Sequence, residues 1–497
     1  MNTIQTDVAI IGAGTAGMSA YRAALAHTAK VVVIEGGPYG TTCARVGCMP
    51  SKLLIAAADA AHGIAHADRF GVHGGALRID GVAVMARVRR ERDRFVGFVL
   101  EAVDNWPEAH RLRGNARFVD NLTLDVDDHT RVQAQRIVIA TGSRPVIPAG
   151  WAAALGDRLI TNDDVFDWHT LPGSVAVVGT GIIGLELAQA LHRLGVRTRL
   201  YGRSDRVGPL TDPALQSVAR QVFAGELPML LSARDWMPSR MPALTPSSDG
   251  DQVLVRATGV LGTDNGNGAR SQTHEERFDL LLVAAGRQPN VEQLNLQATS
   301  LVRDADGIPL FDRRTGQIGT HPVFIAGDVQ DDRPLLHEAA DAGRIAGDNA
   351  GRFPDVRERP RRAPLAVVFT DPQIMLAGTS HAELLRAGTS FESGGVSFED
   401  QGRSRVMGRN QGSLQVYGEH GSGRFLGAEM IGPAAEHIGH LLAWSVQRGD
   451  TVQQMLDSPF YHPVIEEGLR TALRHLQRAL RMGPPPIERC LDCGPGG

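Results

Sequence analysis

Short apolar runs alternate with longer helical patterns along the first half of the chain. Residues 8–11 form an apolar run that leads into a glycine turn, an alanine-rich helical stretch follows, and "VVVIE" (31–35) ends the unit. This order is typical of a strand, a helix and a second, parallel strand. The same succession returns at 174–201, in "SVAVVGTGIIGLELAQALHRLGVRTRLY". The pattern therefore predicts two similar α/β units in one chain.

Further apolar runs predict how the chain moves between these units. "RIVIATGSRPVIP" (136–148) is a strand that enters a glycine turn and returns to the first unit, and "DLLLVAAGRQPN" (279–290) repeats this shape after the second. "VFIAGDVQ" (323–330) has the pattern of a buried strand. Residues 235–276 are polar and rich in Gly, Ser and Asp, which favours a meander with a loose loop.

A third unit follows a linker rich in Pro and Arg at residues 352–364. It begins with strand patterns and ends in two amphipathic helical patterns, "HIGHLLAWSVQRG" and "EEGLRTALRHLQRAL". A chain of 497 residues is too long for one compact core, so three or four domains are expected.

Composition excludes several classes of partner. Hydrophobic residues make up 42% of the chain, and the net charge of −4 gives no basic field for nucleic acid or an anionic membrane. No apolar run reaches the roughly 18 residues of a membrane span, and no leader pattern precedes the first strand. We therefore expect a cytoplasmic protein that binds neither nucleic acid nor membrane.

The glycines of the first unit have the spacing of a dinucleotide-binding turn: Gly12, Gly14 and Gly17. Such glycines let backbone amides approach a pyrophosphate at a helix N-terminus. Glu35 ends the second strand, where an acid accepts a hydrogen bond from a ribose hydroxyl. Strand, turn, helix, strand and acid together predict a dinucleotide site.

The second unit repeats the spacing with Gly179, Gly181 and Gly184. At the place equivalent to Glu35 it has Gly202, and Arg203 and Arg206 follow. A missing acid with neighbouring arginines suits a 2′-phosphate, which favours NADPH over NADH. Gly184 is the choice typical of NAD sites and argues the other way, and the two arginines could be solvated turn residues.

Two of the four cysteines, Cys43 and Cys48, lie close together, and so does one of the only two lysines, Lys52. A disulfide across so small a loop would stabilise little, so its role is expected to be chemical. On a regular helix the two Cα atoms would be roughly 8 Å apart, beyond the reach of a disulfide. The turn between them must be distorted, with Gly47 supplying the freedom before Pro50 starts a helix.

Together these motifs resemble the pyridine nucleotide-disulfide oxidoreductases, most closely the dihydrolipoamide dehydrogenase branch, over residues 5 to about 480. The resemblance rests on the two glycine turns, "CARVGCMPSK" (43–52), "ATG" (140–142), "GD" (327–328) and "YHPVIEE" (461–467). It implies an α/β fold with two Rossmann-like three-layer domains, which bind FAD and NAD(P), and an α+β C-terminal dimerisation domain.

The resemblance also assigns roles at the cysteine pair. Cys48 would be the thiol against the flavin, and Cys43 the thiol that exchanges with substrate. Lys52, one helical turn after Cys48, would lower the pKa of that thiol and pair with Glu186 of the nicotinamide domain. Without the resemblance, Glu186 is equally well an ordinary acid in the first turn of a helix.

A histidine and a glutamate near the end complete the expected chemistry. By the resemblance, His462 shuttles a proton to and from the exchange thiol, Glu467 orients it, and both come from the partner subunit of a homodimer. Most single histidines are surface residues, which is the simpler alternative. Mercuric reductases resemble this chain elsewhere but carry tyrosine in place of His462, so a thiol substrate is favoured.

The resemblance implies one set of contacts for each cofactor and no resident metal site. The expected FAD contacts are Gly12, Gly14, Gly17, Glu35, Thr42, Lys52, Thr141, Gly142 and Asp328, and the expected NAD(P)H contacts are Gly179, Gly181, Gly184, Arg203, Arg206 and Gly286. The predicted domains are residues 1–150 with 281–355 for FAD, 151–280 for NAD(P)H, 356–481 for dimerisation, and 482–497 as a flexible tail.

The tail carries the second cysteine pair, Cys490 and Cys493, behind a stiff spacer of three prolines. It is interpreted as a second redox pair that relays electrons, as half of a metal site, or as a tail without a role. The expected function is electron transfer between NAD(P)H and a small-molecule or protein-bound disulfide or dithiol. The alternatives are a mercuric-reductase-like or tail-relayed reductase, and an FAD-bearing docking subunit of a multienzyme complex.

Overall fold

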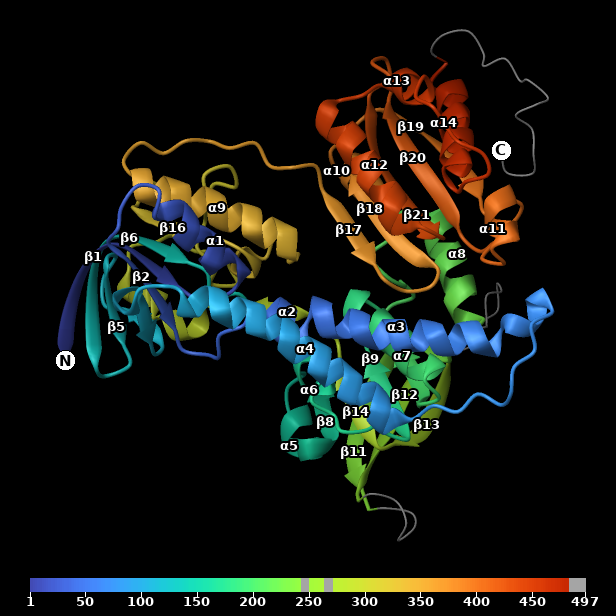
Figure 1. Cartoon of the computed structure of the whole chain (residues 1–497), viewed down its shortest axis with the longest axis horizontal. Coiled ribbons are helices and arrows are strands. Elements are labelled where there is room, and N and C mark those ends of the chain that lie inside the picture. Colours follow the sequence, from blue (N-terminus) through green and yellow to red (C-terminus); the bar gives the residue numbers. More distant parts are fainter. Residues whose placement is uncertain (243–249, 263–270, 482–497) are drawn as a thin grey trace.

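The computed structural model describes residues 1–242, 250–262 and 271–481, and three large sheets organise this part of the chain (Figure 1). The first sheet has the order β3-β2-β1-β6-β5-β4, and β16 also pairs with β6. Its strands are β1 (Asn2–Ile11), β2 (Val31–Glu35), β3 (Arg111–Arg113), β4 (Ala116–Phe118), β5 (Thr123–Val126), β6 (Thr130–Ile139) and β16 (Val323–Ile325).

Alternate residues of β1 face two different cores. Val8 and Ile10 pack with helices α1 (Thr15–Ala24) and α9 (Leu336–Arg352) on one face of the sheet. Ala9 and Ile11 pack on the other face with the hairpin of β4 and β5. Since both faces are covered there, residues 8–11 of β1 and 31–34 of β2 are continuous apolar runs, as is typical of buried parallel strands.

The second sheet has the order β13-β12-β11-β10-β9-β14-β8. Its strands are β8 (Leu159–Thr161), β9 (Ser174–Val178), β10 (Arg197–Tyr201), β11 (Met229–Met241), β12 (Gln252–Leu261), β13 (Gln272–Phe278) and β14 (Leu280–Val283). Helices α7 (Ile182–Arg193) and α8 (Pro213–Ala224) pack against it. β11 to β13 are antiparallel, so the predicted meander is confirmed.

The chain crosses back to the first unit slightly later than predicted. The prediction gave residues from 281 onward to the FAD domain, but β14 continues to Val283 and pairs with β9 and β8. The crossover is the two-stranded ribbon of β7 (Ser143–Pro145) and β15 (Arg287–Pro289). The other domain limits stay a prediction.

The third sheet is antiparallel, in the order β17-β18-β21-β20-β19. Its strands are β17 (Leu365–Val368), β18 (Gln373–Gly378), β19 (Phe391–Ser397), β20 (Ser413–Glu419) and β21 (Phe425–Gly432). Helices α12 (Ala435–Arg448) and α14 (Glu466–Leu480), the two predicted amphipathic helices, pack on it and bury their apolar sides in its core. The predicted fold class is therefore confirmed.

Two long helices connect the three units. α3 (Cys48–Ala65) and α4 (Gly81–Asp104) run from the first unit across the second, and α3 also lies below the third (Figure 1). Leu54 and Ala58 of α3 share a core with Leu187 and Leu191 of α7. In the ranges that the structure describes, no helix is long and apolar enough to cross a membrane.

Candidate active site

The first glycine turn has the geometry of a phosphate-binding turn. Gly12 has φ +105°, a conformation that disfavours any other residue. A Cβ on Gly17 would lie 1.9 Å from the carbonyl oxygen of Gly12, so only glycine lets α1 approach β1 this closely. A Cβ on Gly14, at the N-cap of α1, would meet nothing within 4 Å and would point into open space.

The second glycine turn repeats this geometry almost atom for atom. Gly179 has φ +120°, and a Cβ on Gly184 would lie 1.8 Å from the carbonyl oxygen of Gly179. A Cβ on Gly181, at the N-cap of α7, again meets nothing within 4 Å. Both turns therefore present backbone N–H groups and a helix N-terminus to an open space, as a pyrophosphate requires.

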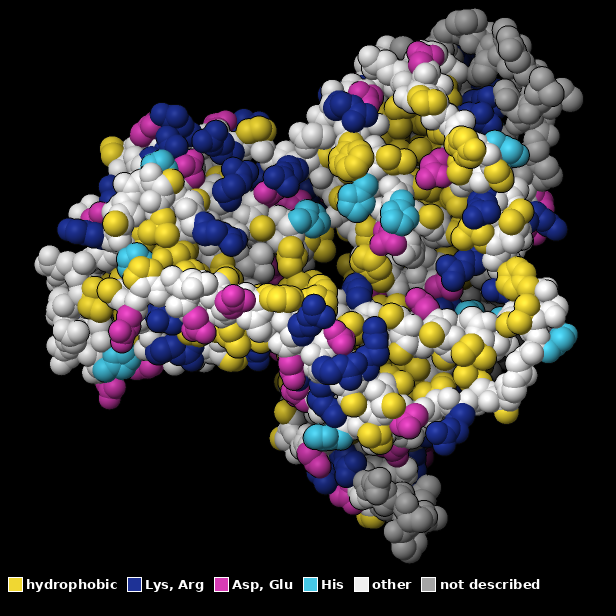
Figure 2. Space-filling view, in the orientation of Figure 1, with side chains coloured by type: hydrophobic (Ala, Val, Ile, Leu, Met, Phe, Trp, Pro, Cys, Tyr) yellow, Lys and Arg dark blue, Asp and Glu magenta, His cyan; other side chains and the backbone are white. Residues whose placement is uncertain are grey.

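A cavity of about 1040 Å³ lies where the three units meet, and the surface is hollowed between the first and third units (Figure 2). Twelve of the predicted site residues line it: Gly14, Thr42, Cys43, Cys48, Lys52, Gly142, Gly179, Gly181, Glu186, Arg203, Gly286 and Asp328. The fold thus brings together residues from both glycine turns and the cysteine pair.

A second cavity, of about 580 Å³, adjoins the first. The predicted residues along it are Gly12, Gly14, Glu35, Thr42, Thr141 and Gly142, and Gly14, Thr42 and Gly142 also line the first cavity. The Glu35 carboxylate accepts hydrogen bonds of 2.7 Å from the backbone N–H groups of Ala13 and Gly37. Glu35 and the glycine turn line the second cavity and Cys48 lines the first, so the residues expected to contact a dinucleotide lie along two adjoining cavities.

The chain between the cysteines is distorted, as predicted. Helix α2 (Thr42–Val46) stops at Gly47, which has φ −123° and ψ −118°, and α3 begins at Cys48. The prediction that Pro50 starts the second helix is wrong by two residues. Proline is tolerated inside the first turn because its missing N–H would have no intrahelical partner there.

The two thiols differ strongly in acidity. Both are free cysteines in this structure. The hydrogen bond from Cys43, and after it the charge of Lys52, lower the pKa of Cys48 to about 7, although burial opposes this. The same hydrogen bond, together with burial, raises the pKa of Cys43. Cys48 is therefore the more acidic thiol of the pair and ionises before Cys43 as the pH rises.

Lys52 and Glu186 form an ion pair across the junction of the first two units. The Lys52 Nζ lies 2.8 and 3.0 Å from the two carboxylate oxygens of Glu186, which is buried with 4% of its side chain exposed. The backbone N–H of Phe369, just after β17, donates to Glu186 at 2.8 Å, and the Phe369 ring lies 4.7 Å from the ammonium. All three units therefore meet at this pair.

Asp328 is fixed by the crossover ribbon. It follows β16, and its carboxylate accepts a 3.0 Å hydrogen bond from the Ser143 hydroxyl. Arg287 donates to the same hydroxyl at 2.9 Å and to the Ser143 carbonyl at 2.7 Å. The carboxylate is thus held at the edge of the large cavity, where it can accept from a polar group of a bound cofactor.

The two arginines predicted near the second ribose have different settings. Arg203 is exposed, lines the large cavity, and has no hydrogen-bond or ion-pair partner among residues 1–242, 250–262 and 271–481. Arg206 donates to the carbonyl of Leu210 at 3.1 Å and does not line that cavity. The acid between them, Asp205, is paired with Arg220 at 2.5 Å.

His462 and Glu467 lie together but away from the cysteines. The His462 Nδ1 is 3.0 Å from a carboxylate oxygen of Glu467, and the same carboxylate accepts from the backbone N–H of Val464. The His462 side chain is 80% exposed, and neither residue lines either cavity. Within one subunit the pair therefore does not join the cysteine site.

Sequence reasoning missed several contributors to the cavity. Phe369 follows an ordinary strand pattern, and no local motif marks its contacts with Lys52 and Glu186. Trp236 lies in residues 235–276, a stretch that was interpreted from its sequence only as polar. A single tryptophan in such a polar stretch was the one sign that this residue lines a cavity. His440, on the predicted helix α12, also lines the cavity.

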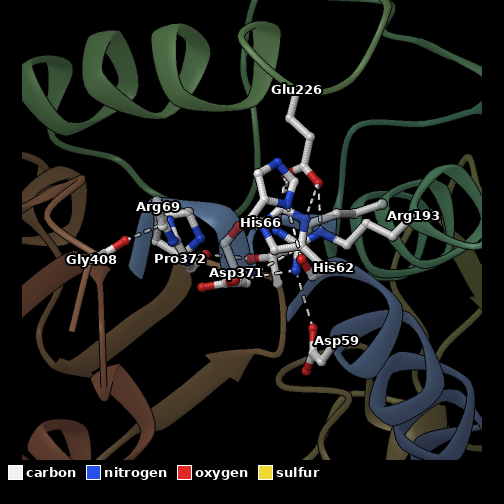
Figure 3. Close-up of polar contacts among 11 residues, drawn as sticks. Asp59, His62, His66, Arg69, Arg193, Glu226, Asp371, Pro372 and Gly408 are labelled. Carbon is white, nitrogen blue, oxygen red and sulfur yellow. Dashed lines mark hydrogen bonds and ion pairs between the residues drawn. The ribbon is translucent and has the colours of Figure 1, made fainter. Parts of the chain in front are cut away.

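A buried arginine holds the three units together at the far end of the α3–α7 contact (Figure 3). Arg193, with 4% of its side chain exposed, pairs with Asp59 of α3, with Glu226 and with Asp371 of the third unit. His62 lies 3.7 Å from Glu226, and burial followed by the charge of Arg193 lowers the pKa of His62. The residues drawn come from all three units, so this cluster fixes their relative positions.

The cysteine pair of the predicted tail, Cys490 and Cys493, lies outside the described residues. Among those that are described, no group of three or more His, Cys, Asp or Glu side chains is placed to hold a metal ion.

Comparison with known proteins agrees with this geometry. Residues 6–227 match the family model of the pyridine nucleotide-disulphide oxidoreductases, and residues 365–473 match the model of their dimerisation domain. The chain is 31% identical to a mercuric reductase of Shigella flexneri over 483 residues, which cover 95% of this chain and 81% of that one. It is 28% identical to a dihydrolipoyl dehydrogenase of Haloferax volcanii, in an alignment that covers 94% of this chain and 95% of that one.

The fold is also similar to that of a solved structure. The HOCl-induced flavoprotein disulfide reductase RclA from Escherichia coli superposes with a TM-score of 0.75 and 20% identity, over 96% of this chain and all of that one. Matched motifs, matches to two family models and a relative aligned over 95% of this chain lead to one conclusion: this chain belongs to the pyridine nucleotide-disulphide oxidoreductases, the NAD(P)H-dependent flavin enzymes that act through a redox disulfide.

Proposed function

We propose that this chain is an NADPH-preferring, FAD-dependent disulfide reductase whose redox centre is the Cys43–Cys48 pair. The observation that carries the proposal is the shared cavity, in which both glycine turns, both cysteines and the Lys52–Glu186 pair meet. When bound, FAD would supply the hydride-accepting, two-electron chemistry that links the nicotinamide to Cys48. The residues of the first glycine turn, Glu35 and Asp328 would hold it.

The chain's own residues then complete a balanced reaction. The electron pair breaks the Cys43–Cys48 bond, which leaves a thiolate on Cys48, stabilised by Lys52, and a thiol on Cys43. Cys43, once deprotonated, attacks the substrate disulfide and releases one substrate thiol. Cys48 then attacks the mixed disulfide, restores the bond and releases the second. Overall, NADPH, one proton and a disulfide give NADP⁺ and two thiols.

A base for this exchange is proposed to come from a partner subunit. His462 is exposed while its Nδ1 is held by the buried Glu467, so its Nε2 is free to meet another molecule. The third unit, whose sequence matches the dimerisation domain, also exposes hydrophobic side chains over α12 (Figure 2), among them Leu441 and Trp444. We propose a homodimer in which His462 of one subunit takes the proton of Cys43 in the other.

The preference for NADPH is supported by Arg203. This residue lines the cavity, Gly202 stands in place of the acid that would bind a free 2′-hydroxyl, and Asp205 is paired with Arg220. A cation without a competing carboxylate suits a 2′-phosphate.

The proposed substrate is a disulfide or dithiol of the lipoamide type, because a histidine stands at position 462. A mercuric-reductase-like activity is the second candidate. Mercuric reductases are among the relatives at 30–31% identity. In this second candidate, Cys490 and Cys493 supply the thiolates that bind Hg²⁺.

Steady-state kinetics of the FAD-loaded protein test both candidates. NADPH and NADH are each paired with lipoamide, glutathione disulfide and Hg²⁺, in the wild type, in Cys43→Ser and in a double Cys490→Ser/Cys493→Ser variant. The proposal expects turnover of lipoamide with NADPH that Cys43→Ser abolishes and the tail variant leaves unchanged.

Turnover of Hg²⁺ that the tail variant abolishes would instead establish the second candidate. Anaerobic reduction provides an independent check. A wild-type protein that accepts only one electron pair, with no long-wavelength absorption band, would rule out the redox disulfide.

A further inference from the structure

Strand β11 departs from regular geometry beside the second nucleotide site. Its pairing with β12 shifts register between Leu231 and Arg234 and again between Arg234 and Met237. Ser232 and Asp235 have φ +49° and +55°, a left-handed conformation that residues with a Cβ rarely adopt. Two strained bulges so close together are typical of a strand that re-aims side chains next to a functional site.

The first bulge holds the loop that carries Arg203. The backbone N–H of Ser232 donates to the carbonyl of Ser204 at 3.0 Å, and the N–H of Ala233 donates to the carbonyl of Gly202 at 2.7 Å. These bonds fix the backbone on both sides of Arg203. The bulged strand and the predicted 2′-phosphate site are therefore one local structure.

The second bulge places Trp236 at the same cavity. Its ring is half-buried and lines the cavity together with Arg203 and Ser204. The indole Nε1 donates to the carbonyl of Ala233 at 3.0 Å, and the ring packs edge-on against Tyr201 with centroids 5.3 Å apart. With its N–H bonded and one edge packed, the indole is held in place while part of its surface faces the cavity.

We propose that Trp236 is the platform on which the adenine of the nicotinamide nucleotide stacks. This inference rests on the proposed function, and it names a residue that determines how the nucleotide is recognised. The turn at Gly179 would take the pyrophosphate and Arg203 the adenosine ribose. The base is attached to that ribose, and Trp236 is anchored beside the loop of Arg203 through Ala233, whose N–H donates to Gly202. Stacking on an aromatic ring suits any purine and needs no hydrogen-bond partner.

The test uses FAD-loaded protein, so that the first nucleotide site is filled. The probe is adenosine 2′,5′-bisphosphate, which has the adenine and the 2′-phosphate but no nicotinamide. Its dissociation constant is measured by calorimetry, and tryptophan fluorescence is recorded in the same titration. The variants are Trp236→Leu, which removes the ring, and Trp236→Phe, which keeps an aromatic face. Trp168→Phe is the control, since Trp168 lines neither cavity.

We expect Trp236→Leu to weaken binding about tenfold or more, and Trp236→Phe to stay within about threefold of the wild type. The quenching of fluorescence by the probe should vanish in Trp236→Phe and persist in Trp168→Phe. Bound FAD, measured by absorbance, should be unchanged in all three variants.

The inference is overturned if Trp236→Leu binds the probe like the wild type, or if Trp236→Phe loses as much affinity as Trp236→Leu. The second result would mean that the bulge needs tryptophan for packing. Failure of the proposed function has a different signature. A wild type that does not bind the bisphosphate, or binds ADP equally well, would refute the 2′-phosphate site whatever the variants do.

Discussion

The two glycine turns of this protein have nearly the same backbone geometry. Gly12 and Gly179 both have φ above +100°. In each turn, a Cβ added to the third glycine would lie less than 2 Å from the carbonyl oxygen of the first glycine. The middle glycine of each faces open space. Steric necessity alone explains both turns, so the turn identifies a dinucleotide site without saying which dinucleotide.

The difference lies just beyond the second strand of each unit. In the first unit Glu35 closes the site with a carboxylate that already accepts two backbone hydrogen bonds. In the second unit the equivalent place is Gly202, and the cation Arg203 faces the cavity. The shared backbone therefore accounts for the general class of ligand, and we propose that the change of charge at the end of the second strand sets the choice within that class. Four variants test this comparison.

The largest effect is expected from Gly184→Ala. Its Cβ would lie 1.8 Å from the carbonyl oxygen of Gly179, so the turn must move and NADPH binding should weaken more than about a hundredfold. FAD content should stay normal because the first turn is untouched. Calorimetry measures the affinity for NADPH, and flavin absorbance measures the FAD content. Gly225→Ala is the control, since its nearest contact is at 3.4 Å; normal binding by Gly184→Ala would contradict the steric argument.

Arg193→Met should loosen the contact between the two units without altering either turn. Arg193 is buried, but the three carboxylates that lose their partner are 24–48% exposed, so water compensates part of the loss and the variant should cost about 1.5–3 kcal/mol. Arg220→Met, which breaks a single exposed pair with Asp205, should cost less than about 1 kcal/mol. Denaturant unfolding compares the two apparent stabilities. Equal losses would show that the cluster does not hold the units together.

Lys52→Met should move the titration of Cys48. The thiolate forms as the pH rises through the pKa of about 7, and loss of the ammonium raises that pKa, by about one unit or more. At neutral pH the thiolate fraction of Cys48 should then fall from about one half to about one tenth, so the reduced protein should react with iodoacetamide about fivefold more slowly. The rate is followed from pH 5 to 10. Lys30→Met, the other lysine, is the control, and an unchanged midpoint in Lys52→Met would remove Lys52 from the proposed role.

The smallest effect is expected from Arg203→Leu. Loss of the charge should lower kcat/KM for NADPH about fivefold to tenfold and leave NADH unchanged, because solvent screens an exposed cation. Arg206→Leu, whose guanidinium donates to Leu210, should change neither value appreciably. The ratio of the two specificity constants is the measurement. A variant that lost both nucleotides equally would show that Arg203 does not distinguish them.

Local sequence patterns were sufficient to predict the features that depend only on residues close together in the chain. The glycine spacing predicted both turns, and the distance between Cys43 and Cys48 predicted the interruption at Gly47. The error at Pro50 was small, since a first turn tolerates proline. Arg203 and Arg206 could not be separated from sequence, because the direction of each side chain depends on Leu210 and the bulged strand.

The sequence by itself determined the two nucleotide-binding turns and the close spacing of Cys43, Cys48 and Lys52, because each depends on a few consecutive residues and on their local steric requirements. Only the tertiary structure decided which distant groups meet them. The backbone N–H of Phe369 donates to Glu186, and Trp236 lines the same cavity as Arg203. Arg193 forms ion pairs with carboxylates from three separate segments. These contacts follow from the packing of three units against one another, and no short window of sequence contains that packing.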